Sequence, residues 1–235
     1  YKKGMLAFEE KNFLKAADKF NEAELLFPQS DWAPKASLMA AYSYYVDGYN
    51  NDSIFQLEQF IKTYRNDKRI PYAHYLLSMS YYNKIVTEKK DIKPLIESKI
   101  KFKHVIENYP STDFALDSKF KLELIEEILA SKEMFIAKHY MKKEKWIPAI
   151  NRLKFILEEY QTTIYVEEAM LRLVEIYFKL GLVDESKKYA SLLGYNYGSS
   201  EWYKQSYKIF KKGYEDPYKK IKKRSKLEKI KSILD

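Results

Sequence analysis

One pattern recurs along the chain and is clearest in the stretch AINRLKFILEEYQ, residues 149–161. A small residue, Ala149, precedes Leu153 and Ile156 at helical spacing, and Tyr160 then closes the segment. Apolar residues three and four positions apart lie on the same face of a helix. The stretch therefore predicts a helix that approaches its neighbour closely at the small residue and ends at the aromatic one.

Four further segments close in the same way, the last of them more weakly. They are Leu26-Phe27-Pro28, Thr63-Tyr64-Arg65, Asn108-Tyr109-Pro110 and Asn196-Tyr197-Gly198. Two of the four intervals between closures lie near the roughly 34-residue period of tetratricopeptide repeats, and the longer two fit the same unit with insertions. The chain is thus predicted to be all-α, an α-solenoid of about five tetratricopeptide-like helix pairs.

Small and large residues fall where such helix pairs need them. The second helices supply, in the order small then large, Ala16, Phe20 and Ala23; Ser53, Leu57 and Phe60; Ser98, Phe102 and Val105; Ala149, Leu153 and Ile156; and Ser186, Ala190 and Leu193. The first helices supply Gly4 and Ala7, Ala41 and Tyr44, Ser78 and Tyr81, Ala137 and Tyr140, and Val174 and Tyr177. Close packing of two helices requires small side chains opposite large ones. The repeat phasing is therefore fixed at many positions.

Proline and glycine residues agree with these helix boundaries. Pro71, Pro94 and Pro148 fall in predicted first turns, where a missing N–H is harmless, and Gly181 and Gly194 are predicted to follow helix ends.

The same boundaries predict the domain organisation. A stretch without Pro or Gly, from Thr112 to about Lys142, predicts one long central helix, and Trp202 to Phe210 a capping helix. We expect an N-terminal block of three repeats at 1–111, a C-terminal block of two repeats and the capping helix at 112–213, and a basic tail at 214–235.

Composition restricts the chemistry that the chain can perform. The 235 residues include no Cys, which excludes disulfides, thiolate nucleophiles and Cys-ligated metals. No apolar run approaches the roughly 18 residues of a membrane span. The chain opens inside a predicted helix and without Met, so we expect further sequence upstream of Tyr1, including any signal or lipid anchor.

The positive charge is concentrated at one end of the chain. The formal net charge is +9, and residues 217–235 contribute eight basic against two acidic side chains. The remaining body is close to neutral, whereas a nucleic-acid groove needs Lys and Arg gathered over the fold. No nucleic-acid partner is predicted.

Catalytic and metal-binding patterns are missing from the sequence. The three histidines, His74, His104 and His139, are assigned to three different helices, and no H-E-x-x-H pattern occurs. Acidic doublets such as Glu167-Glu168 are interpreted as solvated helix faces, and the six glycines are too scattered for a phosphate loop. The prediction is a protein that binds other proteins, not an enzyme, with no cofactor and no metal.

The 22 tyrosines indicate where binding occurs. One face of the first helices lines the concave side of a solenoid, where peptides bind. The predicted peptide groove consists of Tyr42, Tyr45, Tyr72, Tyr75, Met79 and Tyr82. Tyrosine offers large contact area at low entropic cost, which suits an extended peptide rich in aromatic and aliphatic side chains. The alternative for each of these residues is packing in the core or between repeats.

Several segments, finally, carry a resemblance to a known family. They include Phe27-Pro28, Met39-Ala40-Ala41-Tyr42, Lys132-Glu133-Met134, Ala149-Ile150-Asn151-Arg152, Glu159-Tyr160-Gln161-Thr162-Thr163, Val166-Glu167-Glu168-Ala169, Leu180-Gly181-Leu182 and Ser200-Glu201-Trp202-Tyr203. From Tyr1 to about Phe210 the chain resembles the BamD (YfiO/ComL-type) family of outer-membrane protein assembly lipoproteins. Its turns at 50–53 and 65–67 and the Lys89-Lys90-Asp91 insertion depart from the usual pattern.

The resemblance implies a lipoprotein at the periplasmic face of the outer membrane, anchored through an acylated Cys upstream of this chain. Its implied partners are BamA, other subunits of the β-barrel assembly (BAM) complex, and unfolded outer-membrane proteins. Arg152, with Trp146 and Glu175 nearby, is implied to dock a POTRA domain of BamA. The alternative is that Arg152 only links neighbouring helices.

Two questions stay open at this point. The basic tail fits anionic head groups or an acidic partner, and equally a role in solubility. A different periplasmic tetratricopeptide adaptor, acting in envelope constriction or pilus assembly, is the alternative function.

Overall fold

The computed structural model describes residues 1–87 and 92–211, and over these residues it contains eleven α-helices and no strand. The all-α prediction is confirmed. The predicted basic tail and the Lys89-Lys90-Asp91 insertion lie outside the described residues.

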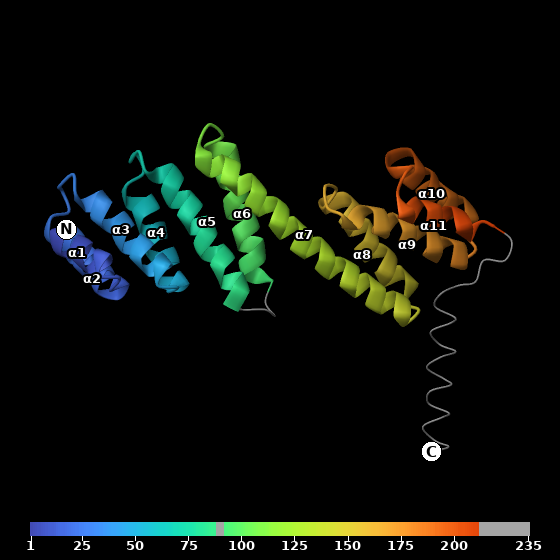
Figure 1. Ribbon diagram of the computed structural model, residues 1–235, viewed down its shortest axis with the longest axis horizontal. Helices are drawn as coiled ribbons and strands as arrows, with labels where there is room; N and C mark the ends of the chain where they lie inside the picture. The colour runs from blue at the N-terminus through green and yellow to red at the C-terminus, as the bar shows by residue number, and fades with distance from the viewer. Residues whose placement is uncertain (88–91, 212–235) are drawn as a thin grey trace, which may run out of the picture. The chain divides into compact units, whose positions relative to one another are not determined.

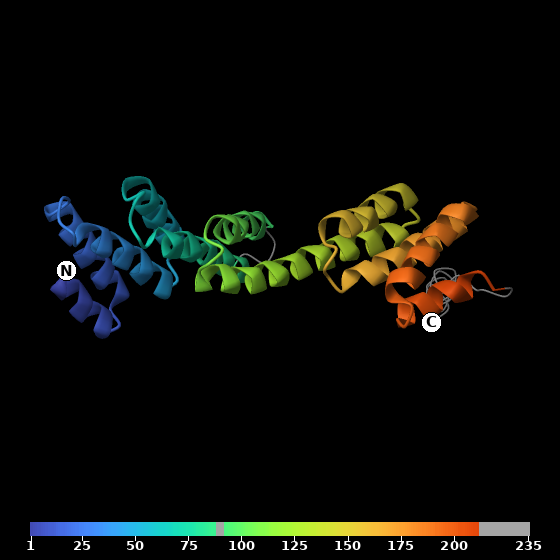
Figure 2. The same ribbon diagram turned by 90° about the horizontal axis from the view of Figure 1, so that it is seen from above.

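The first part of the chain forms successive helix hairpins (Figures 1 and 2). Its helices are α1 (Lys2–Glu9), α2 (Phe13–Leu26), α3 (Ala33–Val46), α4 (Asn50–Thr63), α5 (Ile70–Thr87) and α6 (Lys93–Asn108). Each helix packs against the next one, and α3 also touches α5. This is the arrangement of tetratricopeptide-like pairs, in which the first helices of consecutive pairs lie beside one another.

The second part contains α7 (Asp113–Lys142), α8 (Trp146–Glu159), α9 (Tyr165–Lys179), α10 (Val183–Tyr197) and α11 (Glu201–Ile209). The predicted long helix is confirmed as the 30-residue α7, and the predicted capping helix as α11. Helix α9 is central to this part because it packs against α8, α10 and α11.

The chain divides into two compact units, an N-terminal unit from Tyr1 to Ile125 and a C-terminal unit from Glu126 onward. The change from one unit to the other falls inside α7. The block boundary at 111/112 is a prediction based on repeat phasing alone.

The small residues that lead the second helices are all completely buried: Ala16, Ser53, Ser98, Ala149 and Ser186. The serines among them also hydrogen-bond to a neighbouring first helix. The hydroxyls of Ser53 and Ser80 lie 3.0 Å apart, and the Ser186 hydroxyl donates to the Val174 carbonyl at 2.8 Å. A small polar residue can therefore replace Ala at this position because its hydroxyl finds a backbone or side-chain partner across the contact.

The aromatic closures mark helix ends as predicted. Tyr64 caps α4, Tyr109 caps α6 and Tyr160 caps α8. In each case the backbone N–H of the tyrosine donates to the carbonyl four residues earlier. Gly181 follows α9 with a φ of 77°, the left-handed conformation that favours glycine.

The prediction that Gly194 follows a helix end was wrong. Gly194 lies inside α10, which continues to Tyr197. A Cβ atom at Gly194 would lie 2.6 Å from Cε2 of Tyr203 on α11. Glycine is needed there for the close approach of an aromatic ring, and glycine patterns in a sequence do not distinguish that role from a helix stop.

Candidate protein-binding surfaces

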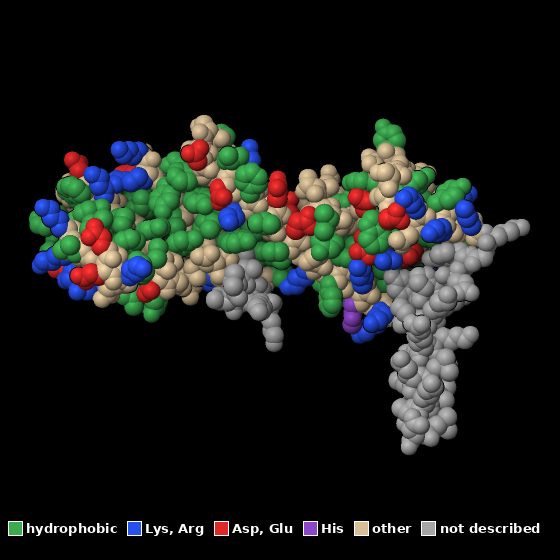
Figure 3. Space-filling model, in the orientation of Figure 1, with side chains coloured by type: hydrophobic (Ala, Val, Ile, Leu, Met, Phe, Trp, Pro, Cys, Tyr) green, Lys and Arg blue, Asp and Glu red, His purple; other side chains and the backbone are tan. Residues whose placement is uncertain are grey.

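The predicted groove tyrosines lie in two sets of neighbouring rings in the N-terminal unit, one on α3 and one on α5. Tyr42 and Tyr45, one turn apart on α3, have ring centroids 6.3 Å apart, and Phe8 of α1 stacks on Tyr42 at 5.7 Å. Figure 3 shows hydrophobic side chains gathered over α3, α5 and the start of α7. We call these rings the aromatic surface; they are Phe8, Tyr42, Tyr45, Tyr72, Tyr75, Tyr82 and Phe114, and the fully buried Phe102 supports them.

Helices α5 and α7 continue the aromatic surface. Tyr72, Tyr75, Met79 and Tyr82 repeat at three- and four-residue spacing on α5, so they share one helix face. Phe114 at the start of α7 lies between the first two of these tyrosines, with centroid distances of 5.3 Å and 5.4 Å. All the predicted groove residues are half-buried, so the rings contribute to packing while keeping part of each side chain open to a ligand.

The hydroxyls of Tyr72 and Tyr75 on the aromatic surface have a raised pKa and stay protonated at neutral pH. Burial, with the neighbouring phenols of Tyr42 and Tyr45, raises the pKa of Tyr72 to about 12. Burial and a hydrogen bond to Asp117 raise the pKa of Tyr75, whose hydroxyl donates to the Asp117 carboxylate at 2.7 Å. The surface therefore offers neutral hydroxyl groups beside apolar ring faces, with one carboxylate at its edge.

Sequence reasoning missed three contributors to this surface, Phe102, Phe114 and Asp117. Phe102 was assigned only to the core, where it is indeed fully buried, but its ring also supports Tyr75 and Tyr82 at 6.4 Å. Phe114 and Asp117 lie one turn apart in the long helix, which was treated as a connection. Their helical spacing on the first turns of α7 was the available signal.

The three residues expected to dock a partner lie in the C-terminal unit, and each has a different partner. Arg152 on α8 pairs with Glu133 on α7, with 3.0 Å between Nη1 and Oε2, and the Arg152 side chain is 45% exposed. Lys179 lies over the Trp146 ring, 4.6 Å from its centroid. Glu175 accepts two hydrogen bonds from Arg172. Arg152 thus links two helices and remains partly accessible.

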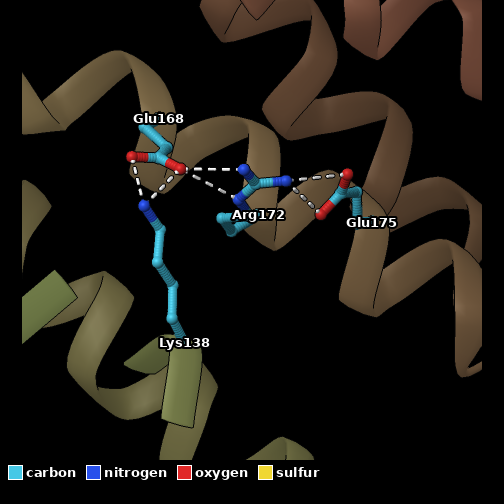
Figure 4. A network of polar contacts seen from close by, with 4 residues as sticks. All are labelled: Lys138, Glu168, Arg172 and Glu175. Carbon is cyan, nitrogen blue, oxygen red and sulfur yellow. Dashed lines mark hydrogen bonds and ion pairs between the residues drawn. The ribbon is translucent and has the colours of Figure 1, made fainter. Parts of the chain in front are cut away.

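Glu175 belongs to a chain of charged contacts that Figure 4 shows in detail. Lys138 of α7 lies 2.8 Å from Glu168 of α9, and Glu168 in turn lies 2.8 Å from Arg172. Burial opposes ionisation of Glu168, but the hydrogen bonds from Lys138 and Arg172 outweigh it and lower the pKa of this carboxyl. The interpretation of Glu167-Glu168 as a solvated face was wrong for Glu168, which is only 7% exposed.

The histidines are also closer than their places in the sequence indicate. The rings of His74 on α5 and His104 on α6 lie 4.5 Å apart. Across residues 1–87 and 92–211, however, no group of three or more His, Asp or Glu side chains is arranged to hold a metal ion. Within the same ranges, every helix is too short or too polar to cross a membrane.

The comparison with known families decides the identity of this helical chain. Residues 1–193 match the family model YfiO, described as "Outer membrane lipoprotein". The chain belongs to the YfiO family.

Relatives in this family are similar over most of their length. The outer membrane protein assembly factor BamD of Rickettsia prowazekii is 39% identical over 211 residues, which cover 90% of this chain and 84% of the relative. BamD of Caulobacter vibrioides is 32% identical over 234 residues, covering 98% and 77%. Among solved structures, the TPR2AB-domain:pHSP90 complex of yeast Sti1 aligns with a TM-score of 0.44 at 14% identity, over 87% of this chain and 78% of that one.

Proposed function

We propose that this YfiO-family chain is a scaffold and substrate-receiving subunit of the outer-membrane β-barrel assembly complex. The N-terminal unit binds unfolded outer-membrane proteins, and the C-terminal unit docks a POTRA domain of BamA. The relatives named BamD support the pathway, and the aromatic surface is the observation that supports the receiving role. The work is binding rather than catalysis, at the periplasmic face of the outer membrane, with a lipid anchor upstream of Tyr1.

The aromatic surface suits an extended chain with alternating apolar side chains, as in an unfolded barrel strand. Its rings already pack against one another, as Phe8 does on Tyr42 and Phe114 on Tyr72, and they therefore lose little conformational entropy on binding. The protonated hydroxyl of Tyr72 can donate to a carbonyl group of an extended peptide. The Tyr75 hydroxyl donates its one proton to Asp117 and can accept a hydrogen bond from a peptide N–H.

Arg152 is the residue proposed to orient the POTRA contact. Its guanidinium carries five N–H donors, and Glu133 is bonded to Nη1 alone. A carboxylate of the partner can therefore bind the remaining donors, while Glu133 holds the side chain in place.

Photo-crosslinking tests the receiving role. A photoreactive residue is placed at Tyr42 or Tyr82, and a matched control replaces Phe55, an aromatic residue on α4 that is 63% exposed and outside the aromatic surface. With a peptide copied from the C-terminal strand of a β-barrel protein, we expect crosslinks at Tyr42 and Tyr82 and few at Phe55. Equal yields at all three positions would contradict the proposal.

A pulldown with the periplasmic POTRA region of BamA tests the docking role. Arg152→Glu is expected to abolish or strongly reduce capture, because it reverses the charge facing the partner carboxylate. Lys143→Glu, at an exposed position in the same unit, is the control and should bind as the wild type does. Unchanged capture by Arg152→Glu would remove this residue from the interface.

A further inference from the structure

A second candidate site lies in the N-terminal unit, in an open pocket of about 500 Å³ formed by α4, α5 and α6. Its apolar lining consists of Ile61, Leu77 and Ile100, and its polar lining of Glu58, Lys62, Arg65, His74, Lys101 and His104. None of these residues belongs to the aromatic surface. The pocket is therefore a separate feature of the unit.

The rim of this pocket has an excess of positive charge. Three cations, Lys62, Arg65 and Lys101, line the pocket together with a single carboxylate, Glu58. Within the described residues, these three cations form no ion pair. The Arg65 Nε atom donates to the Lys62 carbonyl at 3.2 Å, which fixes the guanidinium beside the end of α4. Unpaired cations from α4, from the turn after it and from α6 create a local potential that attracts anions.

Two imidazoles complete the pocket. His74 and His104 lie ring to ring at 4.5 Å, and Tyr109 is 5.6 Å from His74. Burial, followed by the charges of His104 and Lys101, lowers the pKa of His74 to about 4. At neutral pH this imidazole is therefore uncharged, and it can donate one hydrogen bond to a ligand or accept one from it.

We propose that the pocket binds an acidic peptide segment of a partner protein. Aliphatic side chains of the segment would contact Ile61, Leu77 and Ile100, while its carboxylates bind Lys62, Arg65 and Lys101. The apolar lining favours a peptide over a free inorganic anion, because an inorganic anion gains nothing from aliphatic contacts. This surface is additional to the binding of unfolded barrel proteins and of BamA.

Fluorescence anisotropy with the whole chain tests this site. The probe is a short labelled peptide that alternates Leu and Glu, and its matched control alternates Leu and Gln. We expect the acidic peptide to bind, the neutral one to bind at least about tenfold more weakly, and added salt to weaken the acidic complex. Binding of both peptides with equal affinity would overturn the proposal.

Charge-reversal variants locate the binding. Arg65→Glu and Lys101→Glu are each expected to weaken binding of the acidic peptide by roughly tenfold or more, because each replaces attraction by repulsion. Lys103→Glu is the matched control, since Lys103 is exposed on the same helix as Lys101 but does not line the pocket. Circular dichroism melting shows whether each variant folds. An equal loss in Lys103→Glu would show non-specific attraction and contradict the site.

Nuclear magnetic resonance of the imidazoles gives an independent readout. Bound carboxylates beside His74 should raise its pKa, because a nearby negative charge stabilises the protonated ring. The other groups in or beside the pocket are Glu58, Lys62, Arg65, Lys101, His104 and Tyr109. Peptide binding without a response of the His74 and His104 signals would place the ligand elsewhere.

Inorganic phosphate is the third ligand tested. If phosphate binds as tightly as the acidic peptide, the pocket is a site for small anions and the peptide proposal is contradicted. Any of these failures leaves the crosslinking test of the aromatic surface unaffected.

Discussion

Single tyrosines on the aromatic surface pack against the core and also keep part of the ring exposed for binding. Tyr42, Tyr45 and Tyr72 pack against a core that includes Leu57 and Phe60, yet each keeps an exposed portion. Removing a whole ring would therefore change stability and binding together. Removing only a hydroxyl separates the two effects, and Tyr75 is suited to this because its hydroxyl has an identified partner.

Tyr75→Phe is expected to lower the free energy of unfolding by about 1 kcal/mol, because it deletes a hydrogen bond to a carboxylate. Urea denaturation measures this change. Tyr49→Phe removes a hydroxyl from a tyrosine that is 46% exposed and should leave the stability unchanged. A loss of the same size in both variants would show that the contact with Asp117 is not the cause.

His74 gives the N-terminal unit a specific pH dependence. Its pKa is about 4 in the folded chain, where burial and then His104 and Lys101 disfavour the charged ring, against about 6.5 in an unfolded chain. Between these values the unfolded state binds a proton that the folded state does not. The contribution of His74 to the free energy of unfolding is fully present above about pH 6.5 and is lost as the pH falls towards about 4.

The measurement compares unfolding free energies across that pH range in the wild type and in His74→Gln. The wild type is expected to lose more stability on acidification, because the variant has no ring to protonate. His139→Gln, at an exposed position, is the control. Identical pH profiles for the wild type and His74→Gln would contradict the expectation.

At the scale of helices, α11 depends on its first turn. Ser200 precedes the helix in an extended conformation, and its hydroxyl accepts a hydrogen bond from the Tyr203 backbone N–H at 3.1 Å. Because α11 has only nine residues, it holds little helical stability of its own and relies on this cap and on packing against α9 and α10.

Ser200→Ala is expected to destabilise α11 by about 1 kcal/mol, the usual cost of losing an N-cap. Hydrogen exchange of the α11 amides should quicken, while α9 exchange remains slow. Ser199→Ala, one residue earlier and exposed, is the control and should change neither. Unaltered α11 exchange in Ser200→Ala would show that packing alone holds this helix.

Helices were more predictable than the surfaces they form. Helix ends at Tyr64, Tyr109 and Tyr160 follow from local pattern, since a cap involves residues only four positions apart. The pairing of Arg152 with Glu133 depends on how α7 and α8 are rotated about their axes, which no local pattern specifies.

In the aromatic surface, too, local features were predictable from the sequence and contacts between helices were not. The face that Tyr72 and Tyr75 share on α5 was predictable from helical periodicity, whereas the insertion of Phe114 from α7 depends on contacts between helices. The adjacency of His74 and His104 was likewise hidden by their separation along the chain. Periodicity thus specifies a helix face but not the neighbour that covers it.

At the scale of the whole chain, the two compact units have separate cores. Leu57 is fully buried in the N-terminal unit and Leu171 is fully buried in the C-terminal unit. Contacts within helical repeats are mostly between neighbours, so a defect in one unit should spread poorly to the other.

Leu57→Ala and Leu171→Ala are each expected to cost about 2–5 kcal/mol of local stability, because each leaves a cavity in a packed core. Hydrogen exchange with mass spectrometry should show faster exchange in α4 and α5 for the first variant and in α9 and α10 for the second. The two variants serve as controls for each other. Uniform acceleration along the whole chain in either variant would mean that the units unfold as one.

The contact between Gly194 and the Tyr203 ring also restricts how this protein can diverge. Any side chain at 194 would displace the ring, so a substitution there has to accompany a smaller residue at 203. The two positions should therefore change together among relatives, and a relative that keeps the aromatic residue should keep the glycine. We therefore expect the join between α10 and α11 to be inherited as a pair of residues, 194 and 203, rather than as two independent ones.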